Sequence, residues 1–244
     1  MKLSEIYSFL DRLSPFQNQA NWDNSGILLG DLDNEIDTIY TSLDIDENLI
    51  KEASENSLFI VHHPLIFKPL KELTGEKYPR AFIKEMIKKN ISLIALHTNY
   101  DLSHLNSYFT KEILGFKEFK QEQYLIYVDV DIDFKDLCHH VKKALNLDTL
   151  RISFCGKQKI KRLAICTGSG GDLIPFVNAD CFISGDFKYH QALEALSNKL
   201  SLIDIGHFES ECYFAQALAK DLQNLSLKVI IKVSKNPFQF FKEN

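Results

Sequence analysis

The sequence predicts an α/β fold of two α/β domains, each with a mainly parallel or mixed sheet flanked by helices. Short runs rich in Leu, Ile and Val alternate with amphipathic segments along the 244 residues, as they do in β-α-β units. The character of the chain also changes around residues 119–127. We therefore expect a first domain over residues 1–120 and a second over 121–244. The last strand of the chain is a candidate to return to the first domain.

The first half is predicted to run β-α-β-α-β after an N-terminal helix. Its expected strands end in turn residues, and its expected helices place apolar residues three and four positions apart. The helix at 79–90 is expected to turn Phe82, Ile83, Met86 and Ile87 inward. The expected strands are 38–44, 58–61 and 91–96, and the expected helices are 4–13, 47–56, 79–90 and 102–114.

The second half is predicted to form another α/β unit. A glycine cluster, Gly168-Ser169-Gly170-Gly171, follows one of its strands. The cluster resembles a phosphate-binding loop, but it lacks the Gly-Lys-Ser/Thr ending of the P-loop, so by itself it does not predict a nucleotide site. The expected strands are 124–128, 162–167, 181–184, 200–205 and 229–233, and the expected helices are 133–145, 186–196 and 210–224.

The composition disfavours several classes of protein. A hydrophobic content of 45% and a charged content of 25% are ordinary for a soluble globular protein. The net charge of -5 and the pI of about 5.9 argue against a nucleic-acid groove, which needs clustered Lys and Arg. No apolar stretch approaches the roughly 18–20 residues of a membrane helix, and the N-terminus has no signal-peptide core. The five widely spaced cysteines predict reduced thiols in a cytoplasmic protein.

Histidine and carboxylate residues follow three of the apolar runs. In open α/β sheets, ligands bind outside the carboxyl ends of the strands, so side chains at these ends are candidates for one site. Imidazole and carboxylate groups are the ligands that Zn, Fe and Mn accept. We therefore expect these residues to bind metal, as two ions. The candidates in chain order are His62, His63, His97, Asp101, His207 and Glu211.

Two adjacent histidines can serve one site only where a strand ends, because neighbouring side chains on a strand point to opposite faces. Pro64 restricts His63 to an extended or turn geometry, which favours such an end after His62. A second pair, His139-His140, lies in the middle of a predicted helix, without a neighbouring turn or carboxylate. We interpret the second pair as helix surface.

Two further features each leave two interpretations open. Asp186 and His190 are four residues apart after a predicted strand. They are either a carboxylate at a helix N-terminus with a histidine packed behind it, or an acid–base pair that supports the site. Trp22, the only Trp, lies in the polar turn Asn21–Gly26. We favour a packing anchor with a satisfied indole N–H over a catalytic group.

Covalent catalysis is disfavoured. The sequence contains no G-x-S-x-G nucleophile motif, and no cysteine stands near a histidine in a known family signature.

Six motifs occur in an order typical of one family, and several ordered motifs are far more specific than one. On these motifs the chain resembles the GTP cyclohydrolase 1 type 2 homologue family, also called the interacting-factor-three-like family. One departure is Ser184, where the family usually has Thr. The motifs are Asn21-Trp22-Asp23-Asn24-Ser25-Gly26, His62-His63-Pro64-Leu65-Ile66-Phe67, His97-Thr98-Asn99-Tyr100-Asp101, Gly168-Ser169-Gly170-Gly171, Ser184-Gly185-Asp186 with His190, and Asp204-Ile205-Gly206-His207 with Ser210-Glu211.

The resemblance implies two α/β domains, a dinuclear metal site and a ring-shaped homohexamer. It implies that His97 supports the residues that bind the metal and is not itself a ligand. The longer members of the family carry an inserted domain, for which this chain has no room. The metal ligands that the resemblance implies are His62, His63, Asp101, His207 and Glu211.

The family name implies hydrolytic opening of the imidazole ring of GTP at C8 by metal-activated water, with release of formate. Glu211 or His97 would relay protons in this hydrolase. One alternative is a metal-binding or metal-trafficking protein, or a partner-binding ring, without turnover. Another is a metal-dependent phosphoester hydrolase acting on a nucleotide or other small molecule. The ligand set accommodates Zn, Fe, Mn or Ni and does not identify the metal.

Overall fold

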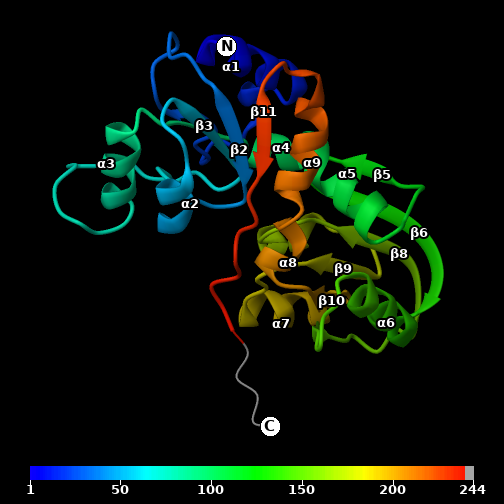
Figure 1. Cartoon of the computed structure of the whole chain (residues 1–244). Coiled ribbons are helices and arrows are strands. Elements are labelled where there is room, and N and C mark those ends of the chain that lie inside the picture. Colours follow the sequence, from blue (N-terminus) through cyan, green and yellow to red (C-terminus); the bar gives the residue numbers. More distant parts are fainter. Residues whose placement is uncertain (240–244) are drawn as a thin grey trace. The chain divides into compact units, whose positions relative to one another are not determined.

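The computed structural model describes residues 1–239 and divides into two compact units (Figure 1). Unit 1 contains Met1–Tyr100 together with the described residues from Cys212 onward, and unit 2 contains Asp101–Glu211. Each unit has one sheet with helices packed on it, so the chain has the predicted α/β class.

The sheet of unit 1 has five strands in the order β1-β4-β3-β2-β11. All neighbours are parallel except β1, which runs antiparallel to β4. Val61 pairs in register with Ser42 on one side and with Ala95 on the other. Three parallel strands therefore end level, and the residues that follow them emerge at one edge of the sheet. The strands are β1 Gly26–Leu29, β2 Thr38–Ser42, β3 Ser57–Val61, β4 Ser92–Ala95 and β11 Lys228–Ile231.

Helices cover both faces of this sheet, which explains why β3 is buried along its whole length. Phe59 and Val61 pack in one apolar cluster with residues of α2 and α3. On the opposite face, Thr41 of β2 donates a hydrogen bond to the backbone carbonyl of Ala215 in α9. The helices are α1 Leu3–Leu13, α2 Glu47–Glu52, α3 Arg80–Lys88, α4 Thr98–Tyr100 and α9 Phe214–Asp221, with 3₁₀ turns η1 Phe16–Asn18 and η5 Leu222–Asn224.

The sheet of unit 2 has six strands in the order β5-β6-β8-β9-β10-β7. Its centre is parallel, because β9 runs parallel to both β8 and β10, whereas β5, β6 and β7 pair antiparallel. Ser184 pairs with Asp204, so β9 and β10 also end level. The strands are β5 Lys120–Glu122, β6 Leu125–Asp133, β7 Arg151–Ser153, β8 Lys159–Ile165, β9 Cys181–Ser184 and β10 Ser201–Asp204.

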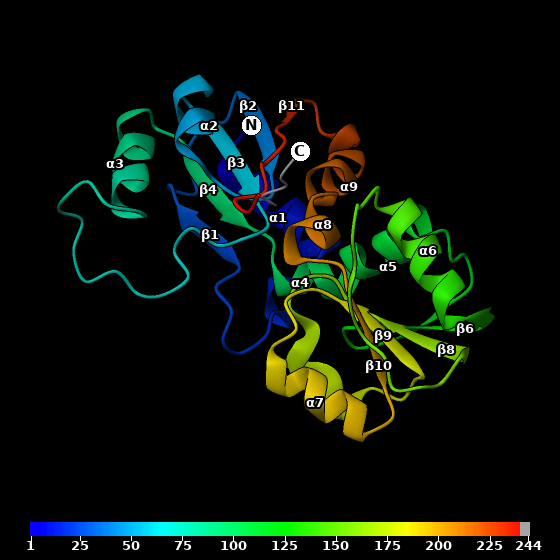
Figure 2. The same cartoon turned by 90° about the horizontal axis from the view of Figure 1, so that it is seen from below.

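The helices of unit 2 lie on both sides of its sheet (Figure 2). Ala195 of α7 packs with Phe182 and Leu202 in one cluster, whereas α6 buries Leu137 and Val141 against the sheet at β6. The helical segments are η2 Asp101–Leu105 and η3 Phe109–Ile113, both π-helical, α5 Asn106–Tyr108, α6 Phe134–Ala144, the 3₁₀ segment η4 Gly170–Phe176, α7 Tyr189–Ser197 and α8 His207–Glu211.

Three local expectations are wrong. The helix expected from Asp186 begins at Tyr189, because Asp186 has a φ of 57° and lies in a turn. The helix expected at 102–114 begins at Thr98, so Asp101 lies within helical backbone. Ile87, expected to face inward, is 52% exposed, while Ile83 and Met86 are buried.

Two findings concern the whole described chain. No helix in residues 1–239 is long and apolar enough to span a bilayer. All five cysteines are free thiols.

Candidate metal centre

In unit 1, the sheet edge brings three histidines together. His62 and His63 follow β3 directly, and His97 follows β4 after one residue. Their ring centroids are 5.1 Å apart for His62 and His63, 5.0 Å for His62 and His97, and 5.7 Å for His63 and His97. One ring nitrogen from each of the three lies within 4.8 Å of the others, so this group could hold a metal ion.

The backbone explains how two adjacent histidines reach one place. The N–H groups of His62 and His63 both donate to the carbonyl of Leu43, so the chain turns as β3 ends. The strand no longer alternates there, and both imidazoles lie on the same side. His62 is fully buried, with the ring of Phe214 at 4.9 Å.

Each of these three imidazoles uses Nδ1 for a hydrogen bond within unit 1. The acceptors are the carbonyl of Leu96 at 2.9 Å for His62, the Asp44 carboxylate at 2.8 Å for His63, and the Asp23 carboxylate at 2.7 Å for His97. A carbonyl oxygen or ionised carboxylate can only accept, so Nδ1 carries the proton. When such a ring is neutral, its lone pair is on Nε2. Metal-binding histidines commonly have this tautomer, with Nε2 on the metal and the Nδ1 proton donated to an acceptor.

Asp23 joins the turn before β1 to the end of β4. Its side chain is fully buried and accepts from the backbone N–H groups of Asn24 and Thr98, the hydroxyls of Ser25 and Thr98, and His97. Burial alone would raise the pKa of Asp23, but the hydrogen bond and charge of His97, together with the other donors, hold this pKa well below its usual range. Asp23 therefore stays ionised and fixes the orientation of His97.

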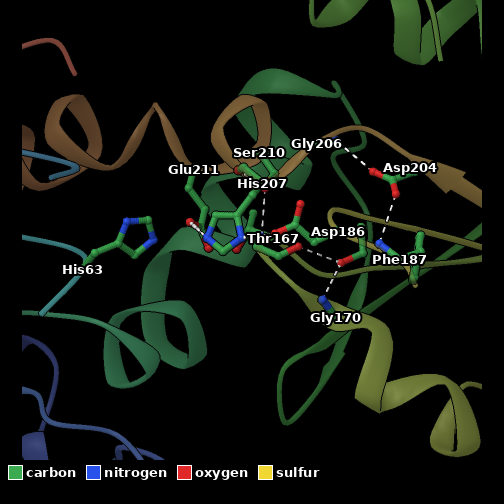
Figure 3. Close-up of polar contacts among 12 residues, drawn as sticks. His63, Thr167, Gly170, Asp186, Phe187, Asp204, Gly206, His207, Ser210 and Glu211 are labelled. Carbon is green, nitrogen blue, oxygen red and sulfur yellow. Dashed lines mark hydrogen bonds and ion pairs between the residues drawn. The ribbon is translucent and has the colours of Figure 1, made fainter. Parts of the chain in front are cut away.

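In unit 2, His207 lies between two carboxylates (Figure 3). Its Nδ1 is 2.9 Å from Oδ2 of Asp186, and its Nε2 is 2.9 Å from Oε2 of Glu211. Glu211 lies four residues after His207 in α8, and Asp186 lies in the turn after β9. A lone pair on Nε2 would repel an ionised Glu211 carboxylate, so this arrangement requires either a proton between the two atoms or a cation bound by both groups.

The glycines of unit 2 permit this close packing. A Cβ at Gly168 would lie 2.2 Å from Oε1 of Glu211, and Gly168 has a φ of 65°. A Cβ at Gly185 would lie 2.7 Å from the backbone of Gly206. The glycine cluster therefore makes room for Glu211, and two of its amides are already used: Gly168 N–H donates to Ser210 and Gly170 N–H donates to Ser184.

Asp204, the last residue of β10, fixes both turns beside His207. Its carboxylate accepts from the N–H of Phe187 at 3.0 Å and the N–H of Gly206 at 3.0 Å (Figure 3). Arg151 of β7 donates to the same carboxylate and to the carbonyl of Phe187. The turn that carries Asp186 and the start of α8 thus depend on one buried side chain.

The negative charges of Asp101 and Glu211 both influence the pKa of the Cys166 thiol. Burial raises the pKa of Cys166 well above its usual range, and the negative charges of Asp101 and Glu211 raise it further. Two acidic groups therefore lie near one buried position of unit 2. Carboxylates gathered in this way favour a cation.

The donor chemistry fits divalent metal. Unit 1 offers three imidazoles that each use Nδ1 for a hydrogen bond within the unit, and unit 2 offers a carboxylate–imidazole pair with 2.9 Å between donor atoms. Two donors each about 2.1 Å from one ion and at right angles would be separated by about 3 Å. The described side chains therefore suit Zn, Fe, Mn or Ni.

The structure resolves two of the open interpretations. Asp186 contacts His207, which is 21 residues away, and not His190, which is exposed. Trp22 is 63% exposed, so the favoured interpretation of this residue as a packing anchor is wrong. The control pair His139-His140 lies on the exposed side of α6, as expected.

Sequence reasoning missed the acceptors behind the histidines. Asp44 ends a predicted strand among other acidic residues, a pattern that usually marks a solvated face, and Asp23 lies in a polar turn. The only local signal was position, because Asp44 follows a strand that ends beside β3.

Comparison with known proteins gives consistent matches over the full chain. A family model described as Duf34/NIF3 (NGG1p interacting factor 3) matches residues 1–237. The GTP cyclohydrolase 1 type 2 homolog of Campylobacter jejuni is 73% identical over 241 residues, which cover 99% of this chain and 100% of the relative. The GTP cyclohydrolase 1 type 2 of Helicobacter pylori strain J99 is 41% identical, with 97% and 98% covered. The crystal structure of Staphylococcus aureus protein SA1388 is similar with a TM-score of 0.86 and 25% identity, over 99% of both chains.

Proposed function

Because the chain belongs to the Duf34/NIF3 family, we propose that it is a dinuclear metal-dependent hydrolase that opens the imidazole ring of GTP. The metal ligands of this proposal are one set carried over from the family motifs. They are His62, His63, Asp101, His207 and Glu211.

One observation carries the proposal. In all four histidines of the candidate set, His97 included, Nδ1 lies within 2.9 Å of a carbonyl or carboxylate oxygen of the chain. A surface histidine has no need of such an acceptor. An imidazole that binds metal does, because the acceptor fixes its tautomer, aims Nε2 and increases its basicity.

The chemistry of the reaction divides between the ions and the side chains. Bound ions of this kind supply activated water at neutral pH and polarise the group that is attacked. His97 is held by Asp23 with its Nε2 lone pair available for a proton, and its ring lies against those of His62 and His63. Glu211 is buried beside His207 and has two carboxylate oxygens, so one could hold an ion while the other accepts a proton. These two residues are the proposed proton carriers.

The family resemblance also supports an assembly and a location. We propose a ring-shaped homohexamer, which the molar mass of the purified protein would test. The five free thiols favour the reducing cytoplasm as the site of action.

The test is metal content and formate release, measured on the same samples. Wild type, His63→Ala and His207→Ala would be purified without added metal, analysed by elemental mass spectrometry and assayed with GTP. His139→Ala is the matched control, because it removes an exposed imidazole from α6. We expect about two ions per chain in wild type and the control, and loss of metal and formate release in the other two variants.

Each failure has a distinct meaning. Absence of metal even after reconstitution would overturn the metal centre. Metal at the expected level without turnover of GTP would overturn the hydrolase and leave a binding or trafficking protein. Equal loss of metal in His139→Ala would show that the assay reports general damage.

A further inference from the structure

The exposed indole of Trp22 has an aromatic neighbour. Phe67, in the segment after His63, is 43% exposed, and its ring centroid is 6.1 Å from that of Trp22, with the planes tilted by 58°. A Trp side chain is usually mostly buried, since water around its large apolar surface is unfavourable. Two partly exposed aromatic rings in contact therefore form an apolar surface of defined geometry.

Both rings also contact His97. The imidazole centroid is 6.0 Å from the Trp22 ring and 6.4 Å from the Phe67 ring, with interplanar angles of 76° and 84°. His97 in turn contacts His62 and His63. The aromatic pair therefore borders the histidine group of unit 1.

The backbone around the pair is fixed in advance. The turn that carries Trp22 is held by the five hydrogen-bond donors that converge on Asp23. Asn24 donates from its side-chain amide to the carbonyl of Ile66 at 2.5 Å, which ties this turn to the residue before Phe67. Rings held on restrained backbone lose little conformational freedom when a ligand binds.

We propose that Trp22 and Phe67 bind the planar nitrogen-heteroaromatic ring of the substrate by stacking and position it beside His97. This proposal rests on the proposed function and specifies which residues hold the base. A heteroaromatic ring suits the surface because its faces are apolar and polarisable while its edges carry polar atoms. The surroundings match, since the two aromatic rings stand next to the imidazole of His97, which can form a hydrogen bond with a ring edge.

The chain contains a direct reporter, because Trp22 is its only tryptophan. Stacking of a purine on the indole should quench its fluorescence. Metal-stripped and metal-loaded protein would be titrated with GTP and guanosine, and with inorganic triphosphate and ribose 5-phosphate as probes without a base. Free N-acetyltryptophanamide corrects for light absorbed by the nucleotides. We expect saturable quenching by the two probes with a base and none by the others.

Variants separate stacking from general effects. Phe67→Ala should weaken binding of guanosine about tenfold or more, whereas Phe176→Ala should leave it unchanged. Phe176 is the matched control because it is a 73% exposed phenylalanine of unit 2. Trp22→Leu should lose binding and Trp22→Phe should retain most of it, both measured by calorimetry, with circular dichroism to verify folding.

The outcomes distinguish this proposal from the proposed function. Quenching that depends on Phe67, without formate release, would support stacking and overturn the hydrolase. Formate release with equal guanosine affinity in wild type, Phe67→Ala and Trp22→Leu would overturn stacking alone. A Trp22 emission already shifted to shorter wavelength in the ligand-free assembly, and insensitive to every probe, would show that another copy of the chain covers the pair and would also overturn the proposal.

Discussion

Replacing Asp204 with Asn should destabilise unit 2 more than removing the arginine that pairs with it. Only 8% of the Asp204 side chain is exposed, against 68% for Arg151. One carboxylate oxygen of Asp204 accepts from Arg151 and from the Phe187 N–H, and the other accepts from the Gly206 N–H. In Asp204→Asn, whichever end becomes the amide NH₂ group must face a backbone N–H.

The magnitude follows from these contacts. One buried donor left without an acceptor costs about 1–3 kcal/mol. Loss of the ion pair adds no more than about 1 kcal/mol, because the guanidinium is largely exposed to water. We therefore expect a loss of about 1–4 kcal/mol for Asp204→Asn. Arg151→Met leaves both backbone donors satisfied and should cost about 1 kcal/mol or less.

The assay is urea denaturation monitored by circular dichroism. The free energies of unfolding of the variants and wild type are compared, provided that their m-values are equal. A second measurement is metal affinity, because Asp204 fixes the backbone beside both Asp186 and His207. If Arg151→Met destabilises the protein as much as Asp204→Asn does, the exposed ion pair and not the buried backbone acceptor holds the two turns, and the reasoning is refuted.

Three further predictions concern single positions. Gly168→Ala should lower the melting temperature and metal content, because a left-handed φ costs about 1–2 kcal/mol for a residue with a Cβ and this Cβ would displace Glu211; unchanged metal content would contradict it. Cys166 and Cys181 should resist alkylation in the native protein and react after unfolding, since burial raises the pKa of both thiols; peptide mapping that finds either one labelled natively would oppose this. Asp23→Asn should be destabilising at neutral pH. Because the folded-state pKa of Asp23 is lowered, the ionised group stabilises the fold above its unfolded pKa of about 3.9, so the difference from wild type should shrink as the pH falls below that value, and a constant difference down to strongly acid pH would contradict the assignment.

The elements and strand ends could be predicted from sequence because both depend on local pattern. An apolar run that is buried along its whole length, such as β3, is recognisable by composition, and the turn at Pro64 identifies its end. The candidate ligands at these ends followed from the general rule for open α/β sheets. The parallel strands end level and bring His62, His63 and His97 together, whereas their role as metal ligands stays a prediction.

The acceptors behind the histidines depend on tertiary contacts and could not be predicted. Asp23 meets His97 across 74 residues, Asp44 meets His63 across 19, and Asp186 meets His207 across 21. No periodic pattern marks such a partner. The φ of Asp186 also breaks the helix that its sequence favoured, and that break turns the carboxylate away from His190.

The exposure of Trp22 could not be predicted for a related reason. Burial of a turn residue depends on which segment packs over it, and composition carries no information about that segment. Asp23 in this turn forms the hydrogen bond that orients His97, and the indole of Trp22 beside it lies on the surface.

The path of the chain through unit 1 has a consequence for biosynthesis. Residues 101–211 form unit 2 as one continuous segment, so this unit can fold as soon as it leaves the ribosome. Unit 1 needs α9 and β11, which are translated afterwards; β11 pairs with β2 across 190 residues, as in the contact of Lys228 with Thr38. Phe214 of α9 packs on His62. During synthesis the histidine group should therefore be the last part of the molecule to mature, and a nascent chain that stalls before residue 214 would expose it together with an unpaired edge of β2.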